Sequence, residues 1–219
     1  YQKGFGGHFH NDNSLTIFRD IPGIILAVPS NGADAVKMLR TAVKEAYLNG
    51  RVIVFVEPIA LYMTKDLHEP KDGAWSFTYP DLRKEIPLGE FYSYGESSFL
   101  TIITYGNGLY LSLQAKKEIE KKTQKKIKVI DLCWLSPINF KNLIKNIEKC
   151  KNILIVDECR KTGCHGEGIL GELVTKIGRK SNIELHAADD SFIPLGVAAT
   201  STLPSKESII KNALDLISG

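Results

Sequence analysis

The stretch Leu100-Thr101-Ile102-Ile103-Thr104-Tyr105 is a short run of apolar and β-branched residues without a charge. It predicts a strand covered on both faces, because a strand with one face in solvent alternates apolar with polar residues. Five further candidate strands follow the same reasoning: Ile24 to Val28, Val52 to Val56, Ile127 to Leu132, Ile153 to Val156 and Ile183 to Ala187. We therefore expect a sheet whose strands are buried.

Helical patterns lie between these runs. The clearest occupies residues 31–48, where Asn31 is suited to cap a helix, Asp34 lies in its first turn and apolar residues follow i, i+3, i+4 spacing. Three further helices are predicted: one opened by Ser136 and Pro137, one around residues 169–177 and one opened by Ser205. Strands that alternate with helices predict α/β architecture with a mostly parallel sheet.

The segment from Pro58 to Leu88 interrupts this alternation with four prolines and no sustained periodicity. A structureless stretch much longer than ~15 residues is uncommon inside one domain, so the segment predicts a connection between two domains. The part before it then holds only two strands and one helix. We expect that part to be the tail of a larger domain that begins upstream of Tyr1.

Composition excludes several classes of protein. The chain is 43% hydrophobic and 24% charged, which is typical of a folded globular protein and not of a disordered one. Its apolar runs are far shorter than the ~20 residues that span a bilayer, so no membrane protein is predicted. No signal peptide follows Tyr1, and four cysteines without paired spacing predict reduced thiols in a cytoplasmic protein.

The charge distribution does not favour nucleic acid. The formal net charge is only +3, and the run from Lys116 to Lys128, with seven lysines and two glutamates, has no aromatic residues that could stack on bases. We interpret this run as a solvated helix end that continues into a strand, with an acidic protein partner as the alternative.

A glycine-rich stretch near the start carries two of the five histidines. It runs from Gly4 to Ser14, with His8 and His10 two residues apart and Asp12 after them. Three hypotheses stay open: a metal site, although no third ligand is identifiable; acid–base chemistry near neutral pH; and loop histidines that only bond to backbone.

Asp157 and Glu158 follow a predicted strand, and three glycines at 163, 166 and 168 lead from them into a helix. Ligands favour the carboxyl ends of strands in open α/β sheets, so the place suits a ligand. The glycine order differs from that of a dinucleotide site, and we expect the glycines to shape a turn. The adjacent Cys164 and His165 are a weak candidate for a thiolate nucleophile and its base, because neither has an identified orienting partner.

The order of ten sequence blocks resembles one known family. The blocks are Gly4-Phe5-Gly6 through His10, Ile21-Pro22-Gly23 with Val28-Pro29-Ser30, Phe55-Val56-Glu57-Pro58 with Leu61-Tyr62, Ile86-Pro87-Leu88-Gly89, Thr101 through Gly106, Val129-Ile130-Asp131-Leu132, Leu135-Ser136-Pro137-Ile138, Ile155-Val156-Asp157-Glu158, Thr162-Gly163 and Leu203-Pro204. Together they resemble the beta part of the dehydrogenase (decarboxylating) component of 2-oxo acid dehydrogenase complexes, within the transketolase-like group.

This resemblance implies a domain organisation. Residues 1–75 are similar to the C-terminal part of a thiamine-diphosphate pyrimidine-binding domain, residues 76–87 to a linker, and residues 88–219 to a transketolase C-terminal domain with a mostly parallel sheet. The last of these serves dimerisation and partner contact in the family.

The resemblance also implies a site and a cofactor. The family's active-site histidine falls on His10, although His10-Asn11-Asp12 here replaces the family's H-S-Q block. His10 would contact the substrate carboxylate or help proton movement during acyl transfer to a lipoyl group. The regions that hold most of the thiamine diphosphate and its magnesium are not part of this sequence, so the chain is expected to be inactive by itself.

Two functions from different classes remain. In the first, the chain is part of a 2-oxo acid dehydrogenase in a homodimer or an alpha/beta hetero-tetramer, which works with a lipoyl acyltransferase. In the second, it is a non-catalytic assembly module and His10 has no role. A related transketolase-type enzyme is a further alternative, and both a fused and a separate alpha part stay open.

Overall fold

The computed structural model describes residues 10–219, apart from the side chain of Arg179. The described residues form two sheets, with the strand orders β3-β5-β4-β7-β8 and β2-β1-β6. The larger sheet contains β3 (Tyr92–Tyr94), β4 (Leu100–Thr104), β5 (Ile127–Asp131), β7 (Asn152–Arg160) and β8 (Asn182–Ala188). Its strands are parallel except β3, which runs antiparallel to β5 at one edge.

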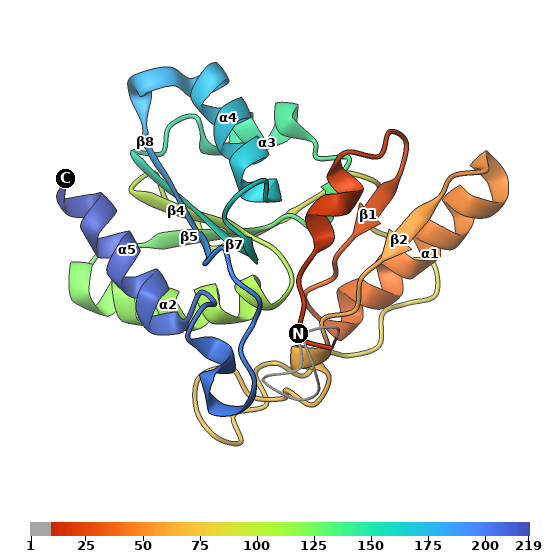
Figure 1. Ribbon diagram of the computed structural model, residues 1–219, viewed down its shortest axis with the longest axis horizontal. Helices are drawn as coiled ribbons and strands as arrows, with labels where there is room; N and C mark the ends of the chain where they lie inside the picture. The colour runs from red at the N-terminus through yellow and green to blue at the C-terminus, as the bar shows by residue number, and fades with distance from the viewer. Residues whose placement is uncertain (1–9) are drawn as a thin grey trace.

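Helices cover both faces of the larger sheet. In Figure 1, α2 and α5 lie on one side of it and α3 and α4 on the other. Their bounds are α2 (Asn107–Thr123), α3 (Phe140–Ile147), α4 (His165–Ile177) and α5 (Lys206–Ser218). The central strands β4 and β5 are buried along their whole length, as near-continuous apolarity predicts.

The smaller sheet joins segments that are far apart in the sequence. β1 (Ile25–Ala27) runs parallel to β2 (Ile53–Phe55) and antiparallel to β6 (Trp134–Ser136). The helix α1 (Gly32–Asn49) connects β1 to β2, and the Asn31 side chain caps it by accepting a hydrogen bond from the Asp34 backbone N–H.

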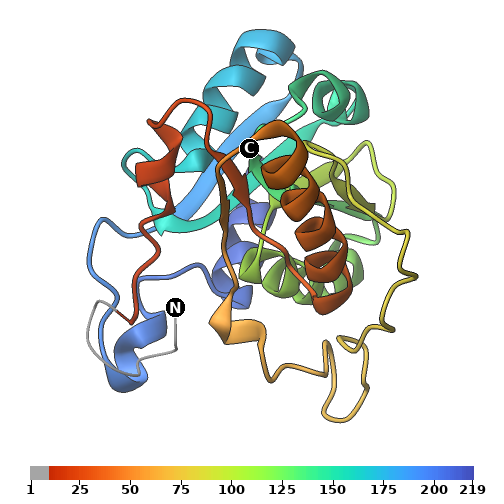
Figure 2. The same ribbon diagram turned by 90° about the vertical axis from the view of Figure 1, so that its right-hand side faces the viewer.

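The long connection after β2 is packed along α1 (Figure 2). It begins with a 3-10 helix, η2 (Ile59–Leu61), and returns past α1, where Thr41 Oγ1 donates a 2.8 Å hydrogen bond to the Ile86 carbonyl. Arg40 donates to the Lys84 carbonyl at 2.9 Å. The remaining 3-10 helices are η1 (Leu15–Arg19), η3 (Gly178–Lys180) and η4 (Gly196–Thr200).

Most of the predicted elements are confirmed. All six predicted strands are present, the cap at Asn31 is correct, α4 includes the predicted residues 169–177, and Ser205 caps α5. The lysine-rich run is the end of α2 followed by β5, as predicted.

The prediction of a helix opened by Ser136 and Pro137 is wrong. Ser136 belongs to β6 and donates a 2.8 Å hydrogen bond from Oγ to the Ile24 carbonyl, so its side chain ties β6 to the segment before β1. The helix begins later, at Phe140, and Asn139 caps it by accepting from the Asn142 N–H. Within the described residues, no helix is long and apolar enough to cross a membrane.

Candidate functional site

A pocket of about 260 Å³ lies where strands of both sheets end. The chain segments that follow β1, β2 and β4 meet the last residues of β7 there. Ligand sites of open α/β proteins favour this position. The pocket is lined by His10, Asp12, Asn13, Leu15, Val28, Val56, Glu57, Pro58, Ile59, Ala60, Tyr105, Gly106, Asn107, Glu158 and Cys159.

Gly106 allows the two sheets to approach each other at this pocket. Its φ of 55° lies in the left-handed region, and a Cβ at this position would stand 3.2 Å from Val28 Cγ1. A larger residue would therefore strain the backbone and push the end of β1 away from the start of α2.

The segment that carries His10 is tied to the end of β7. Arg160 donates a 2.7 Å hydrogen bond to Asp12 Oδ1 and a 3.1 Å hydrogen bond to Ser14 Oγ. Asn13 Nδ2 donates to the Glu158 carbonyl at 3.1 Å. These contacts hold the exposed His10 on the wall of the pocket.

The adjacent carboxylates of β7 have different surroundings, because successive side chains of a strand point to opposite faces. Glu158 reaches the pocket, where its Oε1 accepts a 2.6 Å hydrogen bond from Asn107 Nδ2 at the start of α2. Asp157 is 1% exposed and does not line this pocket. Of the predicted pair, only Glu158 belongs to the pocket.

Asp157 instead organises the turn into α4. It accepts hydrogen bonds from Tyr105 Oη at 2.5 Å, from the Cys159 N–H at 2.8 Å and from the Gly166 N–H at 2.8 Å. Burial, together with the nearby Asp157 charge, raises the pKa of the Tyr105 hydroxyl, so Tyr105 stays a hydrogen-bond donor. Gly163 has a φ of 81°, which agrees with the prediction that glycines shape this turn.

Cys164 does not have the properties of an activated nucleophile. Its side chain is buried, and burial together with the Asp157 charge raises the pKa of the thiol to about 12. The thiolate is the nucleophilic form of cysteine, so Cys164 is unreactive near neutral pH. The neighbouring His165 is also buried, and burial lowers its pKa.

The metal-site hypothesis involved His8, which lies outside the described residues. Across residues 10–219, no group of three His, Cys, Asp or Glu side chains is arranged to hold a metal ion. That hypothesis therefore gains no support from the described part of the chain.

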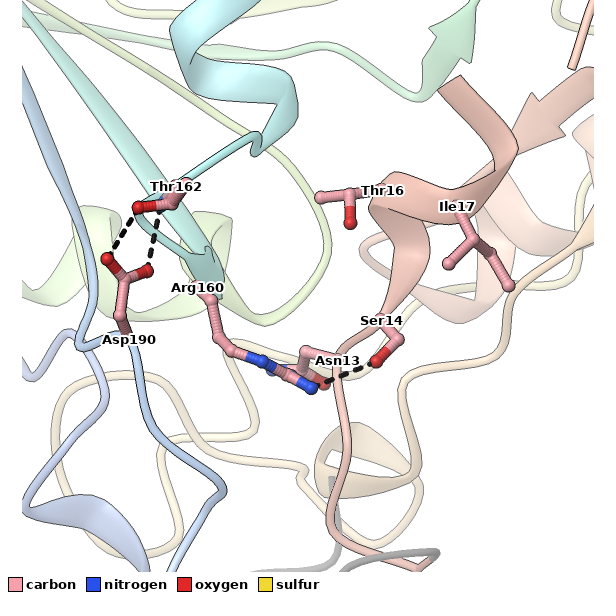
Figure 3. A pocket seen from close by; sticks show the side chains of 7 residues that line it. All are labelled: Asn13, Ser14, Thr16, Ile17, Arg160, Thr162 and Asp190. Carbon is pink, nitrogen blue, oxygen red and sulfur yellow. Dashed lines mark hydrogen bonds between the residues drawn. The ribbon is translucent and has the colours of Figure 1, made fainter. Parts of the chain in front are cut away.

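A second, more polar pocket of about 350 Å³ adjoins the first at Asn13 (Figure 3). Arg160 extends across its floor toward Ser14, and Asp190 accepts two hydrogen bonds from Thr162, one from the backbone N–H at 2.8 Å and one from Oγ1 at 2.6 Å. The pocket is lined by Asn13, Ser14, Thr16, Ile17, Arg160, Thr162 and Asp190.

Sequence reasoning singled out His10, Asp12 and Glu158 but missed Glu57 and Asn107. Glu57 follows β2 directly, and its carboxylate accepts a hydrogen bond from Tyr62 Oη. Asn107 is the first residue of α2 after β4. The rule that predicted a ligand near Asp157, a polar residue at the carboxyl end of a buried strand, applies equally to both residues.

The chain is similar to known proteins. Residues 94–187 match the family model for the transketolase C-terminal domain. The beta subunit of the pyruvate dehydrogenase E1 component from Staphylococcus epidermidis is 27% identical over 216 residues, which cover 95% of this chain and 62% of the relative. The Staphylococcus aureus beta subunit is 26% identical over 220 residues, which cover 97% of this chain and 63% of the relative.

Solved structures share the fold. A chain described as split gene transketolase, inactive beta4 tetramer, superposes with a TM-score of 0.69 at 17% identity, over 97% of this chain and 63% of that chain. Transketolase from Campylobacter jejuni gives a TM-score of 0.58 at 16% identity, over 93% of this chain and 28% of that chain. The larger sheet with its helices therefore has the fold of a transketolase C-terminal domain, and the chain spans less than two thirds of the length of these proteins.

Proposed function

We propose that this chain, which corresponds to the C-terminal portion of a transketolase-like pyruvate dehydrogenase beta subunit, contributes an active-site histidine and a partner-binding domain to a 2-oxo acid dehydrogenase. The reaction is the decarboxylation of a 2-oxo acid with transfer of the acyl group to a lipoyl group. His10 contacts the substrate carboxylate and assists proton movement during that transfer. The predicted resemblance to the beta subunits is confirmed, whereas the activity and the role of His10 are our proposal.

One observation carries the proposal. The segment with His10 is fastened to β7 through Asp12, Asn13 and Arg160, so His10 lies on the wall of a pocket at the carboxyl ends of the strands. This position suits a group that must meet a substrate in a fixed geometry.

The His10 pocket does not fit the diphosphate or the magnesium ion of thiamine diphosphate. No lysine or arginine lines the His10 pocket, whereas Asp12, Glu57 and Glu158 do, and carboxylates disfavour a neighbouring diphosphate. No cluster of metal ligands exists within residues 10–219. The proposal therefore assigns both groups to residues outside this chain, and when bound there the cofactor supplies the carbanion chemistry.

The proposed partners follow from the same assignment. A homodimer or an alpha/beta hetero-tetramer would bring the missing cofactor-binding residues to the His10 pocket, and a lipoyl acyltransferase would accept the acyl group. We propose that the chain alone does not catalyse the reaction, because the lining of the His10 pocket does not suit the diphosphate and no cluster of metal ligands lies within residues 10–219.

The first experiment measures 2-oxo acid-dependent reduction of an artificial electron acceptor with added thiamine diphosphate and magnesium. It compares this chain with a protein extended upstream, with and without an alpha subunit, on pyruvate, branched-chain 2-oxo acids and 2-oxoglutarate. Activity only in the extended or assembled protein supports the proposal. Activity of the 219-residue chain alone would contradict it.

A second experiment separates the enzyme from a non-catalytic assembly module. His10→Ala in the active assembly is expected to lower kcat at least a hundredfold without changing assembly measured by light scattering, because general acid–base groups contribute roughly 10²–10⁴-fold. The control is His68→Ala, which changes an exposed histidine outside the pocket. Unchanged turnover in the His10 variant would favour the assembly module.

A further inference from the structure

A third pocket lies between η1, the connection from β6 to α3, and α4. Its volume is about 310 Å³, and it shares no lining residue with the His10 pocket. Its polar and charged side chains are Arg19, Ser136, His165 and Glu172. In Figures 1 and 2 the red segment that ends in Arg19 lies beside the start of α4, which brings the N-terminal part of the chain against this helix.

Arg19 is held at this pocket by one side of its guanidinium. Its Nη1 donates hydrogen bonds to the Gly163 carbonyl at 3.1 Å and to the Cys164 carbonyl at 2.9 Å. Nε and Nη2 make no hydrogen bond within residues 10–219. A guanidinium that is anchored in this way offers two parallel donors, an arrangement that matches the two oxygens of a carboxylate or phosphate.

Gly168 makes room for this guanidinium. An ideal Cβ at position 168 would lie 2.7 Å from Arg19 Nη2 and 2.9 Å from Arg19 Cζ, which is closer than real Cβ contacts allow. Arg19 therefore lies directly against the backbone of α4. A side chain at position 168 would displace the guanidinium without removing its charge.

His165 supplies a second polar group. It is only 4% exposed, and both ring nitrogens are buried without a hydrogen-bond partner in the described part of the chain. Burial and the nearby Arg19 charge lower its pKa, against an opposing effect of Asp157, so the ring is neutral near pH 7 and keeps one N–H donor. Buried polar groups normally find partners, because an unpaired group loses the hydrogen bonds that it makes with water in the unfolded chain.

We propose that this pocket binds a small oxyanion, a carboxylate or a phosphate, between the Arg19 guanidinium and the His165 imidazole. The pocket is large enough for such an ion, and both residues line it, Arg19 from η1 and His165 from the first turn of α4. Glu172 lines the same pocket and opposes anion binding through its charge. Glu172 therefore limits the affinity of the site.

The test compares two glycine variants of the same helix. Gly168→Ala introduces a Cβ that displaces the Arg19 guanidinium. Nothing lies within 4 Å of a Cβ at Gly171, so Gly171→Ala is the matched control. The ring signals of His165, assigned by their loss in His165→Phe, are followed by NMR during titration of the full chain at pH 7 and constant ionic strength. Sodium phosphate and sodium acetate are titrated separately, which distinguishes the two sources of the oxyanion.

We expect a saturable change of the His165 signals with one or both anions. The dissociation constant should rise at least tenfold in Gly168→Ala, stay within twofold in Gly171→Ala, and fall in Glu172→Gln. The proposal is overturned if neither anion gives saturable changes, which is the result expected if only water binds the His165 ring nitrogens. Equal affinity of the two glycine variants would also overturn it, and the Glu172 variant gives an independent answer if Gly168→Ala does not fold.

Discussion

Asp131 carries a carboxyl group buried in surroundings that differ strongly from water. It ends β5, is fully buried, and accepts a 2.8 Å hydrogen bond from Ser30 Oγ. Its other oxygen, Oδ2, has no hydrogen-bond partner within the described residues. Burial raises the pKa of Asp131 to about 7, and the nearby Asp34 charge adds to the effect.

This pKa predicts how the free energy of unfolding depends on pH. Between the unfolded pKa of 3.8 and the folded pKa of about 7, the folded chain retains a proton that the unfolded chain has lost. The contribution of Asp131 to stability is therefore complete below pH 3.8 and is lost as the pH rises toward 7. The loss in the free energy of unfolding is on the order of 4 kcal/mol. Urea unfolding from pH 4.5 to 7.5 measures this decline.

Asp131→Asn has no carboxyl group to titrate and should abolish the decline. Asp215→Asn on the exposed surface of α5 is the matched control and should retain it. The difference between the two pH profiles is the readout, because the Asp131 variant also changes the absolute stability. Parallel profiles for wild type and Asp131→Asn would contradict the assignment.

Tyr105 carries a second prediction at the scale of one side chain. Its hydroxyl donates to Asp157, which is buried, so Tyr105→Phe removes one of three hydrogen bonds from a buried carboxylate. We expect a loss of about 1–3 kcal/mol in the free energy of unfolding, measured by urea denaturation. Tyr47→Phe, at a side chain that is 87% exposed, should change stability by less than about 0.5 kcal/mol. Similar effects of the two variants would show that the buried hydroxyl does not stabilise the fold.

Glu158 and Asp157 show why sequence reasoning predicts a site at the end of a strand but does not identify which of two adjacent residues belongs to it. Glu158 follows a recognisable strand, and the rule about carboxyl ends of strands places it at the pocket. That rule does not distinguish it from Asp157, which faces the protein interior and organises a turn. Because side chains of a strand alternate between its two faces, Asp157 and Glu158 point in opposite directions. The sequence did not predict this, because it placed the end of the strand at Val156, whereas β7 continues to Arg160.

At the scale of elements, α5 shows how a local sequence pattern defines a helix start. Ser205 Oγ accepts from the Ser208 N–H at 3.1 Å, and Ser208 Oγ in turn accepts from the Ser205 N–H at 2.8 Å. Ser205→Ala should lower the free energy of unfolding by about 1 kcal/mol, since it removes a capping acceptor. Ser218→Ala, at the exposed end of the same helix, is the control for thermal denaturation. Equal melting temperatures of the two variants would exclude a stabilising cap.

The two strands that sequence analysis missed are defined by long-range pairing. β3 and β6 each contain only three residues and pair antiparallel with partners far away in the sequence. The predicted start of α3 at Ser136 was wrong for the same reason, because pairing of Ser136 with Leu26 overrides its suitability as a cap. Asn31 and Ser205 were predictable because their capping partners lie three residues away.

At the scale of the whole molecule, each of the two predicted parts, residues 1–75 and 88–219, buries a tryptophan in an apolar core of the other part. Trp75, the last residue of the predicted N-terminal part, belongs to the apolar cluster of Leu100, Ile102 and the helices α2 and α5, and its ring contacts Tyr110 of α2. Trp134, from the C-terminal part, is fully buried against Ile25 and Met38. Each part therefore completes its apolar core with a side chain from the other, and β6 also completes the smaller sheet.

The burial of Trp75 and Trp134 in each other's part of the chain predicts that the chain unfolds as one cooperative unit. Since the chain contains only two tryptophans, Trp75→Phe leaves fluorescence from Trp134 alone, and Trp134→Phe leaves fluorescence from Trp75 alone. In each variant the urea midpoint from fluorescence should equal the midpoint from far-UV circular dichroism, because neither core persists without the other. Each variant supplies its own comparison, so a change in overall stability does not affect the result. Separate fluorescence and dichroism midpoints in either variant would show that the two predicted parts are independent folding units despite their shared sheet.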